Sequence, residues 1–413
     1  MFDFTVPLAA QSLDVIQRLQ QAGFVAYFAG GCVRDALLKR EPKDFDVATD
    51  ASPETVRHVF GKKRTLAYGA SFGVIGVLGP ASVATEVATF RSDGEYSDGR
   101  RPDTVRYGTA EHDAQRRDFT INGMFYDPVS AKLIDFVGGE ADLQKRMIRA
   151  IGEPQRRIHE DKLRMLRAVR FAASLAFQLD ELTADAIRQC APDVSIVSGE
   201  RIGAEMRRMS VGTGARLAFE LLHSTRLLAQ VWPQVSKLFE RDRESCLTLI
   251  QQSAKHSFEV VCAGLLAMLG ECHPAEMNEL AQAWKLSCDE QRAISQACDH
   301  YQVVLSANQL PWSVLQPLVA SRDASTIIGL AESWAHAFDK ELEGVDLAWS
   351  RFRWPREQLD PLPLLTGDTL RKLGYRPGPQ FGPVLQATRD AQLDNKLLSE
   401  ADAIVFARRL LDV

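Results

Sequence analysis

A short stretch, residues 28–50, constrains this chain most strongly, because it joins a glycine pair to two closely spaced aspartates. Its sequence is FAGGCVRDALLKREPKDFDVATD. We expect a strand, a turn at Gly30-Gly31, a short helix, and then a second strand over residues 44–49. Successive side chains of a strand point to opposite faces of the sheet. Asp44 and Asp46 should therefore project together, while Phe45 enters a core.

Two neighbouring carboxylates such as Asp44 and Asp46 repel each other unless a positive charge lies between them. Mg²⁺ is suited to that position, since it prefers carboxylate oxygens together with substrate phosphates. The glycine pair in front would let a polyphosphate approach the backbone closely. Taken singly, an Asp-x-Asp is most often a solvated loop and a Gly-Gly pair an ordinary turn. Their combination predicts a Mg²⁺ site held by the two aspartates.

The composition is that of an ordinary globular protein. The chain has 413 residues, of which 46% are hydrophobic and 25% charged, so it is long enough for two to four domains. The sequence has no run of about 18 apolar residues and no basic start followed by an apolar block. Its seven cysteines are scattered without a C-x-x-C pair, which fits reduced thiols. We expect a cytoplasmic protein without a membrane span.

Positive charge is concentrated in one segment, although the formal net charge of the chain is −5. Residues 144–170 contain nine lysines and arginines but only three acidic residues. The negative overall charge argues against a nonspecific nucleic-acid binder. The basic segment still allows a local groove for RNA.

The pattern Gly30-Gly31-x-x-Arg34-Asp35, followed by Asp44-x-Asp46, resembles the catalytic head of two related groups of enzymes. These are the class II tRNA nucleotidyltransferases and the bacterial poly(A) polymerases, of the polymerase β-like nucleotidyltransferase superfamily. The resemblance implies an α+β protein with an N-terminal mixed-sheet head followed by an all-α neck, body and tail. It places the head at 1–145, a neck for nucleotide selection and RNA binding at 146–212, a helical body at 213–355, and a tRNA-binding tail at 356–413.

The resemblance also implies roles for individual residues. Asp44 and Asp46 would be catalytic and hold the metal, with Glu86 as a third catalytic carboxylate. An exposed glutamate on the strand expected at 83–90 is an equally good reading of Glu86. Arg116 is a further candidate beside the nucleotide-binding residues, which would be Gly30, Gly31, Arg34, Arg117, Asp118, Asn122, Asp161, Arg164 and Arg167.

Within that set, Asp161 and Arg164 match the family's nucleotide-selecting motif E-D-x-x-R. They belong to residues 158–171, which we expect to form one helix, so they should be neighbours on one helix face. An arbitrary D-x-x-R is nearly always a surface ion pair. In this family, the carboxylate can accept from the exocyclic amino group of cytosine or adenine, and the guanidinium can donate to the adjacent ring nitrogen. Uracil and guanine would leave Asp161 facing a carbonyl, so C and A could be chosen without a template.

A second neck motif, Glu200-Arg201-Ile202-x-x-Glu205, resembles the family element that supports the nucleotide-selecting helix. A purely structural ion pair explains it equally well. From Thr366 onward, glycines and prolines separate short segments that we expect to be helical. This tail is similar to the tail of CCA-adding enzymes, which contacts tRNA.

The function implied is template-independent, metal-dependent addition of C, C and then A to tRNA 3′ ends from CTP and ATP, with release of pyrophosphate. The implied partners are the tRNA 3′ end and the two nucleotides, without a membrane or a protein partner. A poly(A) polymerase, or an enzyme that adds only A or only CC, is the alternative within the same class. A noncatalytic RNA-binding protein with a degenerate head is the alternative from another class.

Sequence features weigh against each alternative. The poly(A) branch of the family carries a basic G-R-R-F-like signature, which residues 68–73 lack. A loop at 91–101, containing Asp98-Gly99-Arg100-Arg101, matches the family's pattern and argues against CC-only addition. The presence of both aspartates, Arg117 and the Asp161/Arg164 pair argues against a noncatalytic protein.

Overall fold

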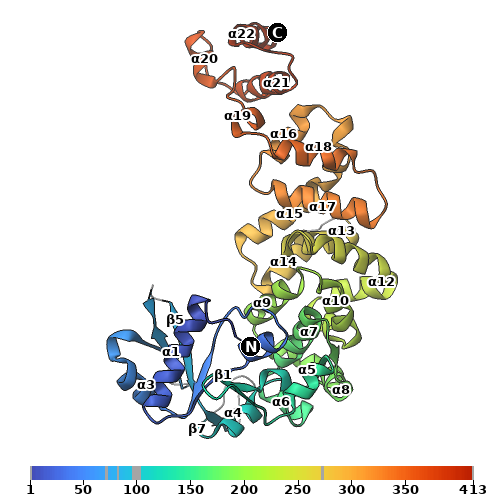
Figure 1. Ribbon diagram of the computed structural model, residues 1–413. Coiled ribbons are helices and arrows are strands. Elements are labelled where there is room, and N and C mark those ends of the chain that lie inside the picture. Colours follow the sequence, from blue (N-terminus) through green and yellow to red (C-terminus); the bar gives the residue numbers. More distant parts are fainter. Residues whose placement is uncertain (1, 70–72, 81–82, 95–103, 271–273, 412–413) are drawn as a thin grey trace. The chain divides into compact units, whose positions relative to one another are not determined.

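The computed structural model describes residues 2–69, 73–80, 83–94, 104–270 and 274–411 (Figure 1). The loop motif at 98–102 lies outside the described residues, as does the middle of the 68–73 segment. The chain divides into two compact units, the first comprising residues 1–205 and 220–231 and the second 206–219 and 232–413.

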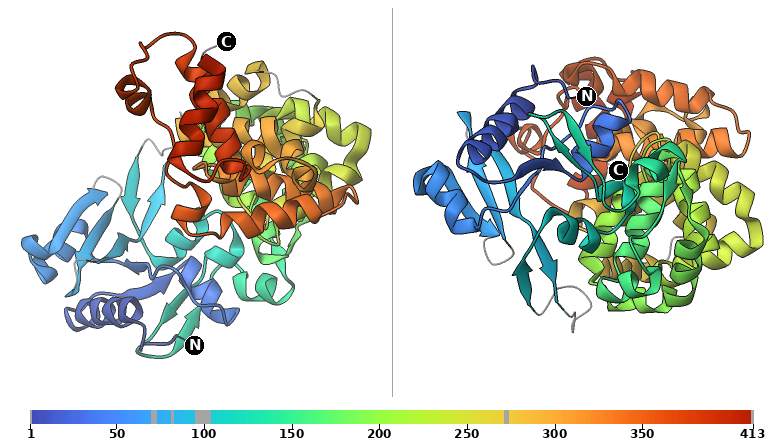
Figure 2. Two further views of the ribbon diagram at one scale, coloured as in Figure 1. Left: turned by 90° about the horizontal axis from the view of Figure 1, so that it is seen from above. Right: turned by 60° about the horizontal axis from the view of Figure 1, so that its bottom comes forward.

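A seven-stranded sheet forms the framework of the first unit, in the order β3-β4-β5-β2-β1-β8-β9. Strand β2 runs antiparallel to β1 and parallel to β5, so the sheet is mixed, as expected. Figure 2 shows these strands from two further directions. Their bounds are β1 Ala26–Ala29, β2 Val47–Thr49, β3 Thr65–Gly69, β4 Val74–Leu78, β5 Ala84–Thr89, β8 Phe125–Asp127 and β9 Lys132–Ile134.

Helices α1 (Pro7–Gln21) and α3 (Pro53–Phe60) pack on this sheet. Helix α1 buries Val15, Ile16 and Leu19, which recur at helical spacing. The sequence Ser52-Pro53-Glu54 predicts a helix start, with a capping hydroxyl followed by a proline, and helix α3 begins there. The side chain of Ser52 accepts a hydrogen bond from the backbone N–H of Thr55.

Short elements complete the first unit. Strands β6 (Arg91–Asp93) and β7 (Val105–Tyr107) form an antiparallel pair, and β10 (Met147–Ile148) and β11 (Gln178–Leu179) a parallel one. Helices α9 (Gly199–Met209) and α10 (Ala215–Ser224) include residues of both units. The other helices are α2 Gly31–Leu37, α4 Ala110–Arg116, α5 Gly139–Gln144, α6 Pro154–Glu160, α7 Arg164–Leu175, α8 Glu181–Cys190 and α11 Leu227–Val231.

Strand β2 is shorter than the sequence indicates, because it begins at Val47 and not at Asp44. Its partner β1 ends at Ala29, whose N–H donates to the carbonyl of Asp46 over 3.0 Å. Beyond that bond the chain turns away at Gly30, so the residues before Asp46 have no strand to pair with. Phe45 is nevertheless buried, with 5% of its surface exposed, as predicted.

The helix expected over residues 158–171 is in fact two helices, since α6 ends at Glu160 and α7 begins at Arg164. Asp161 has an extended backbone, with φ −146° and ψ 108°. Its carboxylate accepts a hydrogen bond of 3.1 Å from the N–H of Leu163. Aspartate side chains compete in this way with helical backbone bonds, and here the result is a break in the helix.

The second unit is helical, as predicted for the body and tail. Helices α12 (Pro233–Ser253), α13 (Phe258–Met268), α15 (Cys288–Leu305) and α17 (Ala324–Ala337) pack against one another. Helical apolar spacing in the sequence predicts helices at 258–269, 277–284, 312–319 and 326–338, which the structure confirms as α13, α14 (Pro274–Trp284), α16 (Trp312–Val319) and α17. The same spacing predicts one helix at 218–228, where the structure has the end of α10 and the start of α11. The remaining helices before the tail are α18 Glu343–Phe352 and α19 Arg356–Leu359.

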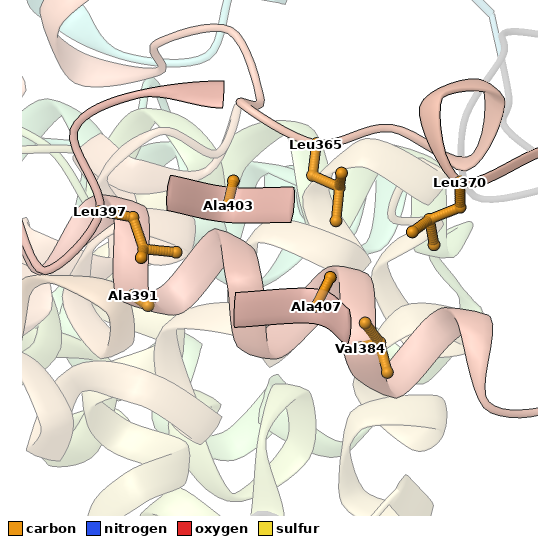
Figure 3. Packing of buried hydrophobic residues seen from close by; sticks show 7 residues of the cluster. All are labelled: Leu365, Leu370, Val384, Ala391, Leu397, Ala403 and Ala407. Carbon is orange, nitrogen blue, oxygen red and sulfur yellow. The ribbon is translucent and has the colours of Figure 1, made fainter. Parts of the chain in front are cut away.

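The tail has a small apolar core of its own (Figure 3). Helices α20 (Gly367–Lys372), α21 (Phe381–Leu393) and α22 (Glu400–Leu411) supply most of its residues. The buried members of this tail core are Leu365, Leu370, Val384, Ala391, Leu397, Ala403 and Ala407. Across the described parts of the chain, no helix combines the length and apolar character needed to cross a membrane.

Candidate active site

The turn at Gly30 and Gly31 brings two predicted site residues close to the backbone. Gly30 has a φ of 72°, a conformation that side-chain-bearing residues rarely adopt. A Cβ at Gly30 would lie 2.8 Å from Nη1 of Arg117, which is too close, whereas one at Gly31 would lie 3.8 Å from Oδ1 of Asp44. Gly30 therefore allows Arg117 to approach the turn closely, whereas the distance from Asp44 to Gly31 is an ordinary van der Waals contact.

Three carboxylates lie near this turn at the entry to β2. The parallel register pairs Val47 with Val87, so the preceding residues Asp46 and Glu86 are adjacent. Burial raises the pKa of Asp46 to about 6, with further contributions from Asp44 and Glu86, against the opposing effect of Arg117. The structure thus brings these carboxylates together without enough positive charge to balance them.

This arrangement fits a divalent cation with Asp44 and Asp46 as its oxygen ligands. Glu86 is exposed at the edge of the site. No described group of three or more His, Cys, Asp or Glu side chains is closely enough arranged to form a metal cluster. The pair of aspartates is therefore the part of the site that suits a metal best.

Four of the predicted nucleotide-binding residues form a continuous polar chain. The guanidinium of Arg34 donates to Oδ1 of Asn122 over 2.7 Å, and Nδ2 of Asn122 donates to Asp118 over 3.1 Å. Arg167 completes the chain with an ion pair of 2.6 Å to Asp118. Burial raises the pKa of Asp118, but Arg167 and the hydrogen bonds outweigh it and lower that pKa to about 2. Asp118 is therefore a charged acceptor at neutral pH.

Asp113 is a site residue that the sequence reasoning missed. Its carboxylate, 1% exposed, pairs with Arg116 over 2.6 Å and with Arg117 over 3.0 Å. Burial raises the pKa of Asp113, but Arg117 and Arg116 outweigh it and keep the pKa below its usual value. The signal was present in the sequence, since an aspartate three and four residues before two arginines can bind both from one helix face.

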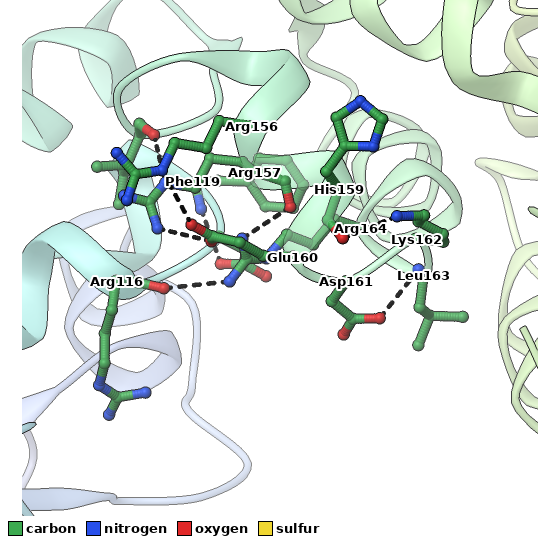
Figure 4. A network of polar contacts seen from close by, with 12 residues as sticks. Arg116, Phe119, Arg156, Arg157, His159, Glu160, Asp161, Lys162, Leu163 and Arg164 are labelled. Carbon is green, nitrogen blue, oxygen red and sulfur yellow. Dashed lines mark hydrogen bonds and ion pairs between the residues drawn. The ribbon is translucent and has the colours of Figure 1, made fainter. Parts of the chain in front are cut away.

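The side chains of Asp161 and Arg164 are not bonded to each other, contrary to the expectation that they are neighbours on one helix face. The two residues are joined only through their backbones, where the N–H of Arg164 donates to the carbonyl of Asp161 over 3.0 Å. Figure 4 shows Arg164 directed at Glu160, with an ion pair of 2.7 Å. Arg164 also donates to the carbonyl of Arg116 over 3.2 Å. Asp161 pairs instead with Arg201 over 2.9 Å. The break between α6 and α7 separates the two side chains and gives each a partner of its own.

Glu160 and the second neck motif complete the surroundings of this pair. Besides Arg164, Glu160 binds Arg157 over 2.8 Å and lies 3.5 Å from Arg156. From the neck motif, Arg201 reaches Asp161, and Glu205 accepts from Arg170 over 2.5 Å. The motif thus contacts the segment at 158–171 at two points, through ion pairs that fit either a supporting role or a purely structural one.

The chain is similar to known proteins over most of its length. A family model described as the poly A polymerase head domain matches residues 26–149, and one described as a probable RNA and SrmB-binding site of polymerase A matches 176–239. The CCA-adding enzyme of Lactobacillus helveticus is 31% identical over 395 residues, which are 95% of each protein. That of Levilactobacillus brevis is 33% identical over 398 residues, 95% of this chain and 96% of the relative. The crystal structure of the Bacillus stearothermophilus CCA-adding enzyme in complex with CTP is 28% identical, with a TM-score of 0.76, and the match covers 98% of this chain and 97% of that one.

Proposed function

This chain belongs to the family of CCA-adding enzymes, and from that premise we propose that it adds C, C and then A to the 3′ ends of tRNA. CTP and ATP are the substrates, no template takes part, and pyrophosphate leaves at each step. The observation that carries the proposal is the similarity to CCA-adding enzymes over 95% of the chain. It is supported by three of the expected nucleotide-binding residues, Arg34, Arg117 and Asn122, which lie beside the turn at Gly30 and Gly31.

The metal of this metal-dependent reaction is Mg²⁺ in our proposal, held by Asp44 and Asp46 with Glu86 beside them as the third catalytic carboxylate. When bound, Mg²⁺ would favour ionisation of the tRNA 3′-hydroxyl and neutralise charge on the triphosphate. Asp46 has a pKa of about 6 and must lose its proton before it can act as a ligand. The site should therefore bind metal better as the pH rises through that value.

The turn and the polar chain beside it are proposed to seat the nucleotide. Gly30 and Gly31 allow the phosphates to approach the backbone, and the guanidiniums of Arg34 and Arg117 suit phosphate oxygens. Asp118 and Asn122 can bind ribose hydroxyls. Arg167 contributes by holding Asp118 charged and fixed in direction.

Asp161 and Arg164 are proposed to read the base. Asp161 accepts from the exocyclic amino group of cytosine or adenine, and Arg164 donates to the neighbouring ring nitrogen. Their side chains are 19% and 11% exposed. Because Arg201 and Glu160 hold them separately, the two reading groups are oriented before a base arrives. Uracil and guanine would present a carbonyl to Asp161 in place of an amino donor, so the lone pairs of Asp161 that face the base would stay unpaired.

The test uses purified protein, Mg²⁺ and three tRNA transcripts, ending before CCA, after C-C and after the full CCA. Each is incubated with single labelled nucleotides and then with mixtures, and the products are resolved at single-nucleotide steps. Addition of C, C and A followed by a halt is the expected result. Long A tracts would identify a poly(A) polymerase, and A added only to the C-C end would identify a partial enzyme. No incorporation by folded, metal-loaded protein would favour an RNA-binding protein.

Two further expectations belong to this proposal. The first is the division into a head at 1–145, a neck at 146–212, a body at 213–355 and a tRNA-binding tail at 356–413. The second is a cytoplasmic location, where tRNA is processed.

A further inference from the structure

The ring of Phe171, in helix α7, has three arginines around it. The guanidinium carbons lie 5.2 Å (Arg34), 5.4 Å (Arg167) and 4.0 Å (Arg170) from the ring centroid. Cations within about 6 Å of an aromatic ring are attracted by its quadrupole, more strongly where water is excluded. Phe171 is 8% exposed, so these contacts are largely shielded from solvent.

Two of these arginines are also the two ends of the polar chain in the candidate active site. Arg34 binds Asn122 at one end, and Arg167 binds Asp118 at the other. Asn122 and Asp118 are hydrogen-bonded to each other, so the polar chain connects Arg34 to Arg167. The ring of Phe171 contacts both of these arginines and connects them a second time. Displacement of either arginine therefore disturbs the other through the ring as well as through the polar chain.

Phe171 also contacts the segment that carries Asp118. The ring of Phe119, the next residue, packs edge-on against Phe171 with centroids 5.7 Å apart and an interplanar angle of 75°. Phe171 thus connects three segments far apart in sequence: the helix after the glycine turn, the segment around Asp118, and α7 itself.

We propose that Phe171 is a positioning residue that sets the guanidiniums of Arg34 and Arg167 for nucleotide binding. It touches no reacting atom in this arrangement and acts through the two arginines. In the proposed function Arg34 binds the phosphates, and Arg167 holds Asp118, which binds the ribose. Both groups are common to the two nucleotides, so Phe171 should affect CTP and ATP alike. It should leave the choice between bases, which depends on Asp161 and Arg164, unchanged. This inference rests on the proposed function and extends it.

The experiment compares Phe171→Leu with Phe171→Tyr. Leucine fills much of the pocket but has no ring to attract a cation, whereas tyrosine keeps the ring. We expect F171L to raise KM for both CTP and ATP by about tenfold, the effect of losing two partly shielded cation–ring contacts. The value of kcat and the preference for CTP over UTP should stay within about twofold of wild type. F171Y should restore KM to within about twofold.

A matched control separates positioning from stability. Phe90 is 1% exposed and packs against the rings of Tyr27 and Phe125 in the same unit. Phe90→Leu should lower Tm about as much as F171L without raising the nucleotide KM tenfold. An unchanged KM in F171L, or equal KM increases in F171L and F171Y, would overturn the proposal.

Direct nucleotide binding makes the outcome independent of the full reaction. Calorimetric titration of CTP and ATP into wild type, F171L and F171Y should give weaker binding only in F171L. If wild type binds nucleotides but extends no tRNA, the proposed function fails and the binding series still tests Phe171. If wild type completes CCA and F171L binds CTP as tightly as wild type, only the role of Phe171 is wrong.

Discussion

Arg201, in helix α9, donates a hydrogen bond of 2.9 Å to the carboxylate of Asp161, which lies between helices α6 and α7. The other oxygen of Asp161 accepts from the N–H of Leu163. Each carboxylate oxygen is therefore held by one donor and keeps a free lone-pair direction. Asp161 lies outside both helices, and Arg201 holds the orientation of its carboxylate.

Removal of Arg201 should relax base selection. In Arg201→Leu, the carboxylate of Asp161 keeps only its hydrogen bond from the N–H of Leu163 and can rotate. It can then turn away from the carbonyl of uracil, so the repulsion that disfavours uracil is weaker. We expect the ratio of kcat/KM for CTP over UTP to fall about tenfold, which corresponds to about 1.4 kcal/mol of lost discrimination. Single-nucleotide incorporation on a tRNA lacking CCA measures this ratio.

The control for this change is Arg188→Leu, which removes another arginine that pairs with an aspartate in the same unit, Asp185. That substitution should leave base discrimination at the wild-type value. Wild-type discrimination in R201L would show that Leu163 alone is sufficient to orient Asp161.

Asp46 should make metal-free protein less stable as the pH rises. Its pKa is about 6 in the folded protein, above the usual value of 3.8, so the folded state holds the proton more tightly than the unfolded state. Stability from this group is present below about pH 4 and is lost as the pH rises through 6. In EDTA at pH 8, Asp46→Asn should therefore raise the free energy of unfolding by on the order of 1–3 kcal/mol, which is seen as a higher Tm. At pH 4 the substitution should change the Tm little.

Added Mg²⁺ provides the complementary measurement. It should raise the Tm of wild type at pH 8 more than that of D46N, because the variant has lost a charged ligand. The variant should also fail to incorporate nucleotides. Equal stabilisation of the two proteins by Mg²⁺ would contradict the assignment of Asp46 as a ligand.

Asp113 should be essential to both stability and nucleotide binding. Asp113→Asn leaves the guanidiniums of Arg116 and Arg117 beside a neutral group in a buried position. Removal of one partner from a buried ion pair costs about 3–5 kcal/mol, and the remaining amide oxygen recovers part of it. We expect a loss of about 2–4 kcal/mol in the free energy of unfolding, measured by chemical denaturation. CTP binding should weaken as well, because Arg117 loses its ion pair and keeps only its hydrogen bond to the carbonyl of Asn122.

Glu111→Gln is the matched control, since Glu111 is an exposed residue of the same helix α4. It should change stability by less than about 0.5 kcal/mol. If D113N were as stable as E111Q, the two arginines would have other sufficient partners.

The tail core should be needed for tRNA binding and not for nucleotide binding. Leu370 is 0% exposed within the tail core, and Leu370→Ala should destabilise the tail by about 2–5 kcal/mol. We expect weaker tRNA binding in a filter or mobility assay, with the affinity for CTP unchanged. Leu362→Ala, at a residue 88% exposed, should leave both affinities as they are.

The sequence was sufficient wherever a short local pattern determines the structure. Ser52 and Pro53 mark the start of α3, and the glycine pair marks the turn before α2. Phe45 is buried, as the expected alternation predicted, although residues 44–46 precede strand β2. Backbone freedom, capping and side-chain alternation act over a few residues, so they can be recognised without knowledge of the fold.

Tertiary structure decided which partner each charged residue takes. The sequence predicted that Asp161 and Arg164 are neighbours on one helix. Because the helix breaks after Glu160, Asp161 forms an ion pair with Arg201 and Arg164 forms one with Glu160. The length of β2 was likewise decided by where its partner β1 ends. The role of Phe171 as a common contact of three arginines was also visible only in the fold. An arginine can reach any acid or ring that packing brings near it, so its choice among many candidates depends on the folded chain and not on spacing in sequence.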